Sequence, residues 1–255
     1  MKIRRAILAV FALTLLTSAS FAQTYSIPRK LNLEPAARRE FKKWWISPAR
    51  FPGLVPEGFY PIGWSRDGKF AYYVEPVDEA CGCYFAYLAI QDMRTDEKVY
   101  EYKYSQDDTT DAKGEMTGPA NIRALWRKNA KLFNSKLREH GIVARPSVLL
   151  GKNFTFGMAY KAGVIVTKGE DEYGEEKVMK LFYTLDTKTH GAKTLASIDN
   201  SKAEYNGMLD AGVLGAIKSP FGNRVAVVGM EINRGWEGPP HNGDIRIIGA
   251  SLNFK

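Results

Sequence analysis

The two cysteines of the chain are the residues whose spacing most clearly permits chemistry, because they lie two positions apart in Cys81-Gly82-Cys83. The N-terminal segment indicates export from the cytoplasm, and in an oxidising compartment thiols tend to form disulfides. An extended chain would hold the two Cα atoms near the upper limit for a disulfide, and Gly82 permits the necessary bend. We therefore expect an intrachain disulfide. A thiol-redox role and metal binding are alternatives, although two thiolates supply only half of a zinc site.

Histidine spacing indicates no catalytic or metal site. His140, His190 and His241 are far apart in the sequence and form no His-x-x-x-His or His-Glu pattern. The chain also has no glycine-framed serine elbow, P-loop or dinucleotide fingerprint. We therefore assign no catalytic residue, no metal ligand and no cofactor.

Two carboxylates form the least implausible acid–base pair. Glu75 and Glu231 end corresponding strands of two similar segments, and a pair of carboxylates on neighbouring strands can hydrolyse a glycan. The alternative interpretation is two solvated strand ends. The pair would act only if the fold brings both side chains into one cleft.

An aromatic and basic arm, residues 23–58, is a candidate binding surface. Trp44 and Trp45 follow Phe41 at helical spacing, with Arg38 and Lys42 beside them. Such a surface suits an anionic membrane surface or an acidic polymer. Alternatively, the aromatic rings dock the arm against the rest of the protein.

A second candidate surface is the loop that carries Trp236. Glycine and proline surround Trp236 and Glu237, and His241 follows. A large aromatic residue in a loop often serves recognition. The alternative is a ring folded over the edge of a sheet.

These residues need a scaffold, and the hydrophobic pattern predicts one that is mainly β. A helix is expected over 119–140, where apolar residues recur at 3.6-residue spacing before Gly141. Period-two patterns and turn residues predict strands over the following segments. They are 62–65, 69–75, 84–90, 98–104, 153–160, 163–167, 178–185, a strand near Leu195, 213–217, 224–230 and 245–252.

Similar turns at the two ends of this region indicate repeated units. Ser65 and Gly68 precede one strand as Ser219 and Gly222 precede another, and we expect glycine to supply an unusual backbone angle in both turns. The expected fold is antiparallel, blade-like sheets in a partial propeller or a sandwich, with one long packed helix and an N-terminal helical arm. We expect a single β-rich domain over 59–255.

The N-terminus has the parts of a cleaved export signal. Lys2, Arg4 and Arg5 give a positive start, an apolar run covers 6–17, and small residues follow. The run is shorter than the roughly twenty residues that span a bilayer. We expect residues 1–22 to be a signal peptide cleaved near Ala22, a periplasmic or secreted product, and no transmembrane segment in the mature chain.

Cleavage would also lower the net charge of the protein. Loss of the three positive residues lowers the formal net charge from +8 to +5. A modest excess on an exported protein argues against nucleic acid. Envelope polymers, anionic surfaces or another envelope protein are the expected partners.

Four segments together carry a family resemblance. They are Ile62-Gly63-Trp64-Ser65-Arg66-Asp67-Gly68-Lys69-Phe70-Ala71, Leu137-Arg138-Glu139-His140-Gly141-Ile142, Asn223-Arg224-Val225-Ala226-Val227-Val228 and Gly235-Trp236-Glu237-Gly238-Pro239. In order and spacing the chain resembles a family of predicted secreted bacterial proteins of unknown function over roughly 60–252. The resemblance implies an exported, β-rich protein and carries no activity.

The expected function is therefore that of an exported, non-catalytic binding or scaffolding protein of the bacterial envelope. A hydrolase acting on envelope polymers or glycans is the first alternative. A thiol-redox protein that uses Cys81 and Cys83 is the second.

Overall fold

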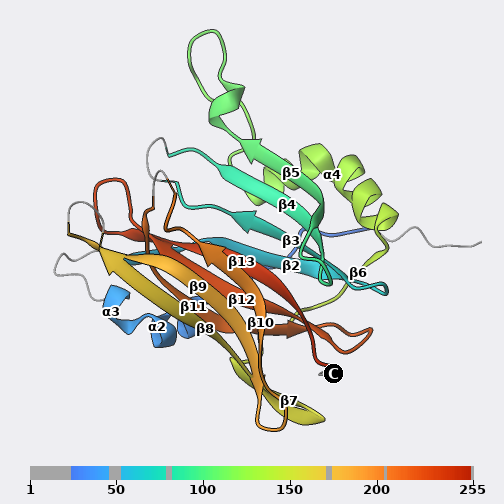
Figure 1. Ribbon diagram of the computed structural model, residues 1–255. Coiled ribbons are helices and arrows are strands. Elements are labelled where there is room, and N and C mark those ends of the chain that lie inside the picture. Colours follow the sequence, from blue (N-terminus) through green and yellow to red (C-terminus); the bar gives the residue numbers. More distant parts are fainter. Residues whose placement is uncertain (1–23, 46–52, 79–81, 171–173, 204–205, 254–255) are drawn as a thin grey trace, which may run out of the picture.

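The computed structural model describes residues 24–45, 53–78, 82–170, 174–203 and 206–253. It is mainly β, with antiparallel sheets, one long helix and a short helical arm, as the sequence predicts (Figure 1). The helices are α2 (Glu34–Glu40), α3 (Lys42–Trp45), the 3-10 turn η1 (Asp107–Thr109) and α4 (Ile122–Glu139).

The strands form three sheets. The helix-covered sheet has the order β5-β4-β3-β2-β6, from β2 (Gly58–Ser65), β3 (Lys69–Glu75), β4 (Phe85–Asp92), β5 (Lys98–Ser105) and β6 (Ile142–Ala144). The central sheet has the order β1-β13-β12-β11, from β1 (Leu54–Pro56), β11 (Met208–Lys218), β12 (Arg224–Asn233) and β13 (His241–Ser251). The outer sheet has the order β10-β9-β8-β7, from β7 (Asn153–Phe156), β8 (Met158–Glu170), β9 (Glu176–Thr187) and β10 (Gly191–Asp199).

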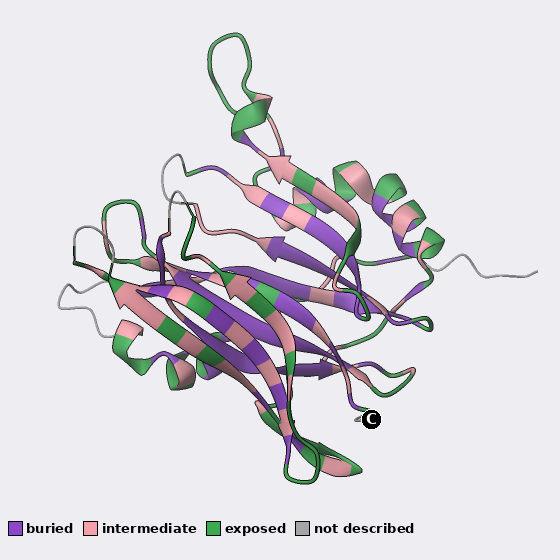
Figure 2. Cartoon of the chain, viewed as in Figure 1, coloured by how far each residue is buried: buried purple, intermediate pink, exposed green. Residues whose placement is uncertain are grey.

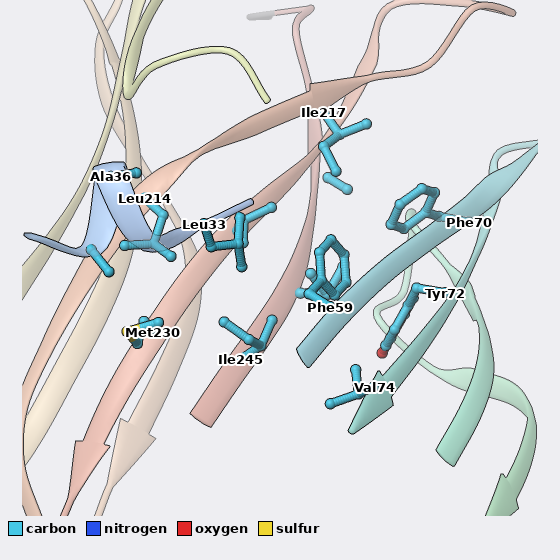
Figure 3. Close-up of a cluster of buried hydrophobic side chains, with 14 of the residues drawn as sticks. Leu33, Ala36, Phe59, Phe70, Tyr72, Val74, Leu214, Ile217, Met230 and Ile245 are labelled. Atoms are coloured by element: carbon cyan, nitrogen blue, oxygen red, sulfur yellow. The ribbon is translucent and has the colours of Figure 1, made fainter. Parts of the chain in front are cut away.

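The layers stack in the order α4, helix-covered sheet, central sheet, outer sheet. Strand β3 shows why: Ala71 and Tyr73 pack under α4, whereas Phe70, Tyr72 and Val74 pack on the central sheet. Figure 3 shows these side chains meeting those of the central sheet. Successive side chains of a strand point to opposite faces, so a strand with both faces covered is apolar at every position.

Strand β12 is covered on both faces in the same way. Ala226 and Val228 face the helix-covered sheet, and Val225 and Val227 face the outer sheet. The buried residues in Figure 2 are therefore concentrated in the central layers. Of the two arrangements open from the sequence, this face-to-face packing is that of a sandwich, extended by a third sheet that curls along its other side (Figure 1).

Helix α4 is shorter than the sequence suggests at its start. The side chain of Asn121 accepts a hydrogen bond from the backbone N–H of Ala124, at 3.0 Å, and caps the helix. Gly141, with φ of 64°, follows its end. The expected start at residue 119 was wrong because Asn121 provides the cap.

The two similar turns are only partly alike. Gly68 has a φ of 98°, as expected for a glycine that closes a tight turn. Gly222 does not have a positive φ, so the same expectation was wrong there. The second turn holds one more residue between its serine and the next strand, which relieves the need for an unusual backbone angle.

The arm docks on the central sheet. Ala37 and Phe41 are buried against it, and a Cβ at Gly212 of β11 would lie 2.7 Å from Phe41 Cζ. Phe41 separates α2 from α3, so the arm is two short helices. The chain beyond Trp45 lies outside the described residues until position 53.

Candidate functional site

The structure brings the two predicted recognition segments together. The ring of Trp44, on α3, meets the ring of His241 edge to face, with centroids 5.3 Å apart and planes at 88°. His241 is the first residue of β13 and ends the loop that carries Trp236. The arm and this loop therefore lie at the same end of the molecule (Figure 1). We call the surface formed by Trp44, Trp45, Trp236 and His241 the aromatic end.

Trp44 is held in place by a carboxylate of the central sheet. Its Nε1 donates to Asp210 Oδ2 at 2.8 Å, and Lys43 Nζ lies 3.1 Å from the same oxygen. The Lys43 ammonium also lies 4.8 Å from the Trp44 ring centroid. Asp210 was missed in the sequence because it is 166 residues from Trp44 and no local pattern marks the contact.

Two other cations of the aromatic end, Arg38 and Arg234, are paired with carboxylates in the same manner. Arg38 stacks over the Trp45 ring at 4.1 Å and pairs with Glu34 at 2.7 Å. Arg234 forms an ion pair with Glu175 at the tip of the β8–β9 hairpin. Lys42 and Glu237, both predicted binding residues, are exposed. The surface therefore has mixed charge.

The surroundings of His241 favour its neutral form. Its Nδ1 accepts from the backbone N–H of Gly235 at 3.4 Å, which leaves Nε2 to carry the proton. Burial, and then the nearby Arg234, lower the pKa of His241. The ring thus acts as a flat support for Trp44.

Trp236 differs from the other aromatic residues of this end. Its side chain is 86% exposed, whereas Trp44 and Trp45 are half-buried against the core. Phe41, Trp44 and Trp45 therefore dock the arm against the rest of the protein. The ring of Trp236 is not folded over the edge of a sheet, so that alternative was wrong. A Cβ at Gly235 would lie 2.2 Å from Pro240 O, so the backbone of this loop is closely packed next to the exposed residue.

The structure does not bring the carboxylates Glu75 and Glu231 together. Glu75 lies on the α4 side of the helix-covered sheet, where the hydroxyls of Tyr60 and Tyr84 donate to it, the latter at 2.8 Å. Glu231 lies on the opposite side of the central sheet, where it accepts from Tyr183 at 3.2 Å. Two sheets separate them, so they cannot act on one substrate.

The interpretation as a solvated strand end was wrong for Glu231, whereas Glu75 is partly exposed at the end of β3. Glu231 is 6% exposed, and Arg246 donates to both of its oxygens, at 3.0 Å to Oε2. Glu75 continues into a hydrogen-bonded chain, because the Tyr84 hydroxyl also lies 2.5 Å from that of Tyr73. Both groups are partnered within the protein.

A buried carboxyl that no sequence pattern indicates lies between β1 and β2. Glu57 is 9% exposed and its Oε2 accepts from the backbone N–H of Ile245 at 2.6 Å. Burial raises the pKa of Glu57 to about 8, helped by the charges of Asp244 and Glu231. No local signal distinguishes Glu57 from a surface glutamate, because its burial follows from the parallel pairing of β1 with β13.

Of the two cysteines, the structure describes one. Cys83 is buried, and its Sγ lies 3.4 Å from Met116 Sδ. Cys81 lies outside the described residues, so the Cys81–Cys83 disulfide stays a prediction. Within the described part of the chain, no three His, Cys, Asp or Glu residues are grouped as a metal site would need.

Comparison of the chain with protein-family models, curated proteins and solved structures found no significant match. The resemblance to a family of secreted bacterial proteins therefore stays an expectation that depends on four sequence segments. No helix in the described ranges is long and apolar enough to cross a membrane.

Proposed function

We propose that this chain is an exported, non-catalytic binding or scaffolding protein of the bacterial envelope, and that its aromatic end recognises another envelope protein. The observation that carries the proposal is Trp236, which is 86% exposed on the loop that ends at His241, whose ring packs on Trp44. Export depends on the sequence of residues 1–22, which lie outside the described part of the chain.

The charge pattern favours a protein over a polyanion at this end. Lys43 pairs with Asp210, Arg38 with Glu34 and Arg234 with Glu175. Protein–protein interfaces are enriched in tryptophan and arginine at their centres and surround them with mixed polar groups. A polyanion would instead favour a surface with unpaired positive charge.

The exposed ring also suits an anchor residue. An exposed tryptophan is large and has few rotatable bonds, so it contributes much contact area for little loss of conformational entropy. The close approach of Gly235 to Pro240 O constrains the backbone next to this residue.

The proposal is tested by Trp236→Ala in a pull-down from an envelope extract of the source cells. We expect the variant to lose a partner that the wild-type protein recovers, since hot-spot tryptophans contribute about 2 kcal/mol or more to binding. The recovered protein is then purified and its affinity for both forms is measured by calorimetry.

The matched control is Leu132→Ala on α4, which removes a large apolar side chain, 39% exposed, on the opposite side of the molecule. It should recover the same partner as wild type. Equal recovery by all three proteins, with equal affinities in solution, would remove Trp236 from the binding surface.

A further inference from the structure

A groove follows the N-terminal segment at the other end of β11 from Asp210. It consists of two adjoining hollows of about 290 Å³ and about 570 Å³. Arg145, Pro146 and Ser147, which follow β6, line both hollows. Two adjoining hollows that share these lining residues suit an extended ligand better than a compact one.

The groove has an unbalanced positive charge. Arg29, Lys30, Arg145 and Lys218 line it, and no described lining residue of either hollow is an aspartate or glutamate. None of the four forms an ion pair with a described carboxylate. This contrasts with the aromatic end, where Lys43, Arg38 and Arg234 each pair with a carboxylate.

Aromatic rings position three cations at or beside the smaller hollow. The guanidinium groups of Arg66 and Arg145 lie 5.3 and 5.5 Å from the centroid of the same ring, that of Phe221. Lys218 Nζ lies 4.8 Å from the ring centroid of Phe156. Cation–π contacts order the long side chains of the two arginines and leave their N–H groups available. Lys218 Nζ also donates to Ser219 O at 3.2 Å and to Gly222 O at 3.3 Å, which leaves one of its N–H groups for a ligand. Because like charges repel, gathering these groups favours a bound anion.

Backbone contacts fix the wall that carries Arg145. Leu150 and Ala216 exchange hydrogen bonds of 2.8 and 3.1 Å, and the N–H of Arg145 donates to Ile62 O at 3.2 Å. A Cβ at Gly215 would lie 2.0 Å from Leu150 O, so a glycine there permits the close approach. The groove is thus formed before any ligand binds, which lowers the entropic cost of binding.

The wall also holds a hydrogen-bond donor without a partner. Trp64 lines the smaller hollow and is 2% exposed, and its Nε1 has no hydrogen-bond acceptor among the described residues. Most buried polar atoms of a folded protein are hydrogen-bonded, so an unpartnered one calls for a functional explanation.

We propose that this groove binds an extended anionic polymer whose chain carries phosphate or carboxylate groups at intervals. Arg66, Arg145 and Lys218 would contact anionic groups at one end of the groove, and Arg29 and Lys30 would contact them at the other. The inference does not depend on the aromatic end, because the turn that holds Phe221 and the loop that holds Trp236 lie at opposite ends of β12.

The test uses inorganic polyphosphate and polygalacturonate as probes, with neutral dextran and a single-stranded DNA oligonucleotide for comparison. Affinities are measured by calorimetry for the mature protein and for the double variant Arg145→Gln/Lys218→Gln. The matched control is Arg127→Gln/Lys131→Gln, which removes the same charge from the exposed face of α4. Thermal unfolding checks that all forms are folded.

We expect wild type to bind at least one anionic probe and not dextran. The groove variant should lose affinity about tenfold or more, and the α4 variant about twofold or less, at low salt. Binding of polyphosphate alone identifies a phosphate-bearing ligand, and binding of polygalacturonate alone a carboxylate-bearing one. Trp236→Ala should bind the probes like wild type, which separates this site from the aromatic end.

Three results would overturn the inference. The first is no binding of either anionic probe by wild type. The second is an equal loss in both double variants, which would mean that net charge alone attracts the probe. The third is tighter binding of the oligonucleotide than of both other probes, which would indicate a nucleic-acid site.

Discussion

Glu57 is a carboxyl whose protonation is coupled to folding. It is buried between β1 and β2, and its hydrogen bond from the Ile245 N–H opposes only part of the cost of desolvation. Its pKa in the folded protein is about 8, against 4.5 ordinarily. The folded protein therefore holds a proton that the unfolded chain releases between these values.

This coupling gives a prediction for Glu57→Gln. In the wild-type protein, the contribution of Glu57 to stability is fully present below pH 4.5 and is lost as pH rises toward about 8. The loss is at most about 1.4 kcal/mol per pH unit. Glutamine keeps an acceptor for Ile245 and has no charge, so the variant should lack this loss.

The measurement is urea unfolding of both proteins at several pH values across that interval. The difference between the two free energies of unfolding isolates position 57 from other titrating groups. A difference that does not change with pH would show that Glu57 is already ionised in the folded protein.

At the scale of elements, the arm shows how a short amphipathic segment is stabilised by docking. Helix α2 has seven residues and α3 four, which is too few for stable isolated helices. The two helices are stabilised by burial of Ala37 and Phe41 in the core and by the Trp44–Asp210 hydrogen bond.

The docked arm predicts a large effect for Phe41→Ala. The ring is 3% exposed and packs on Gly212, so its removal should cost about 3 kcal/mol or more. Urea unfolding measures the loss, and limited proteolysis should show earlier cleavage within residues 34–45. Lys42→Ala, which changes an exposed neighbour, should leave both readouts near wild type. Equal behaviour of the two variants would contradict the docking.

At the scale of the whole molecule, the three sheets depend on close approach across the central layer. Strand β12 has neighbours on both faces, and Gly229 leaves room for the ring of Tyr183 from the outer sheet. The Tyr183 hydroxyl then reaches Glu231, which is also bound by Arg246. Gly229 therefore permits this contact of Tyr183 between the outer and central sheets.

Gly229→Ala should separate these sheets locally. The added Cβ would lie 2.7 Å from Tyr183 Cε1, closer than carbon atoms pack, and we expect a loss of about 1–3 kcal/mol. Thermal unfolding of Gly229→Ala measures this loss. The control is Gly222→Ala, because a Cβ at Gly222 meets nothing within 4 Å. If both variants unfold alike, the sheets do not depend on this contact.

The sequence predicts the classes of element well and their assembly poorly. Alternating apolar residues place β3 and β12 as strands, and the periodic stripe around Trp126 and Phe133 places α4, because these patterns are local. The paired positions of Glu75 and Glu231 looked equivalent for the same local reason. Their separation follows from which face of each sheet is covered, and no local pattern encodes that.

The candidate sites divide in the same way. Residue types alone indicate that Trp44, Trp236 and His241 are candidates for recognition, and they predict an export signal over residues 1–22. Three-dimensional packing joins the arm to the Trp236 loop, buries Glu57, and gathers Arg66, Arg145 and Lys218 around a groove. The physical reason is that period and composition act over a few residues. Sheet stacking instead brings together side chains that are far apart along the chain, and it fixes their burial and their charge partners.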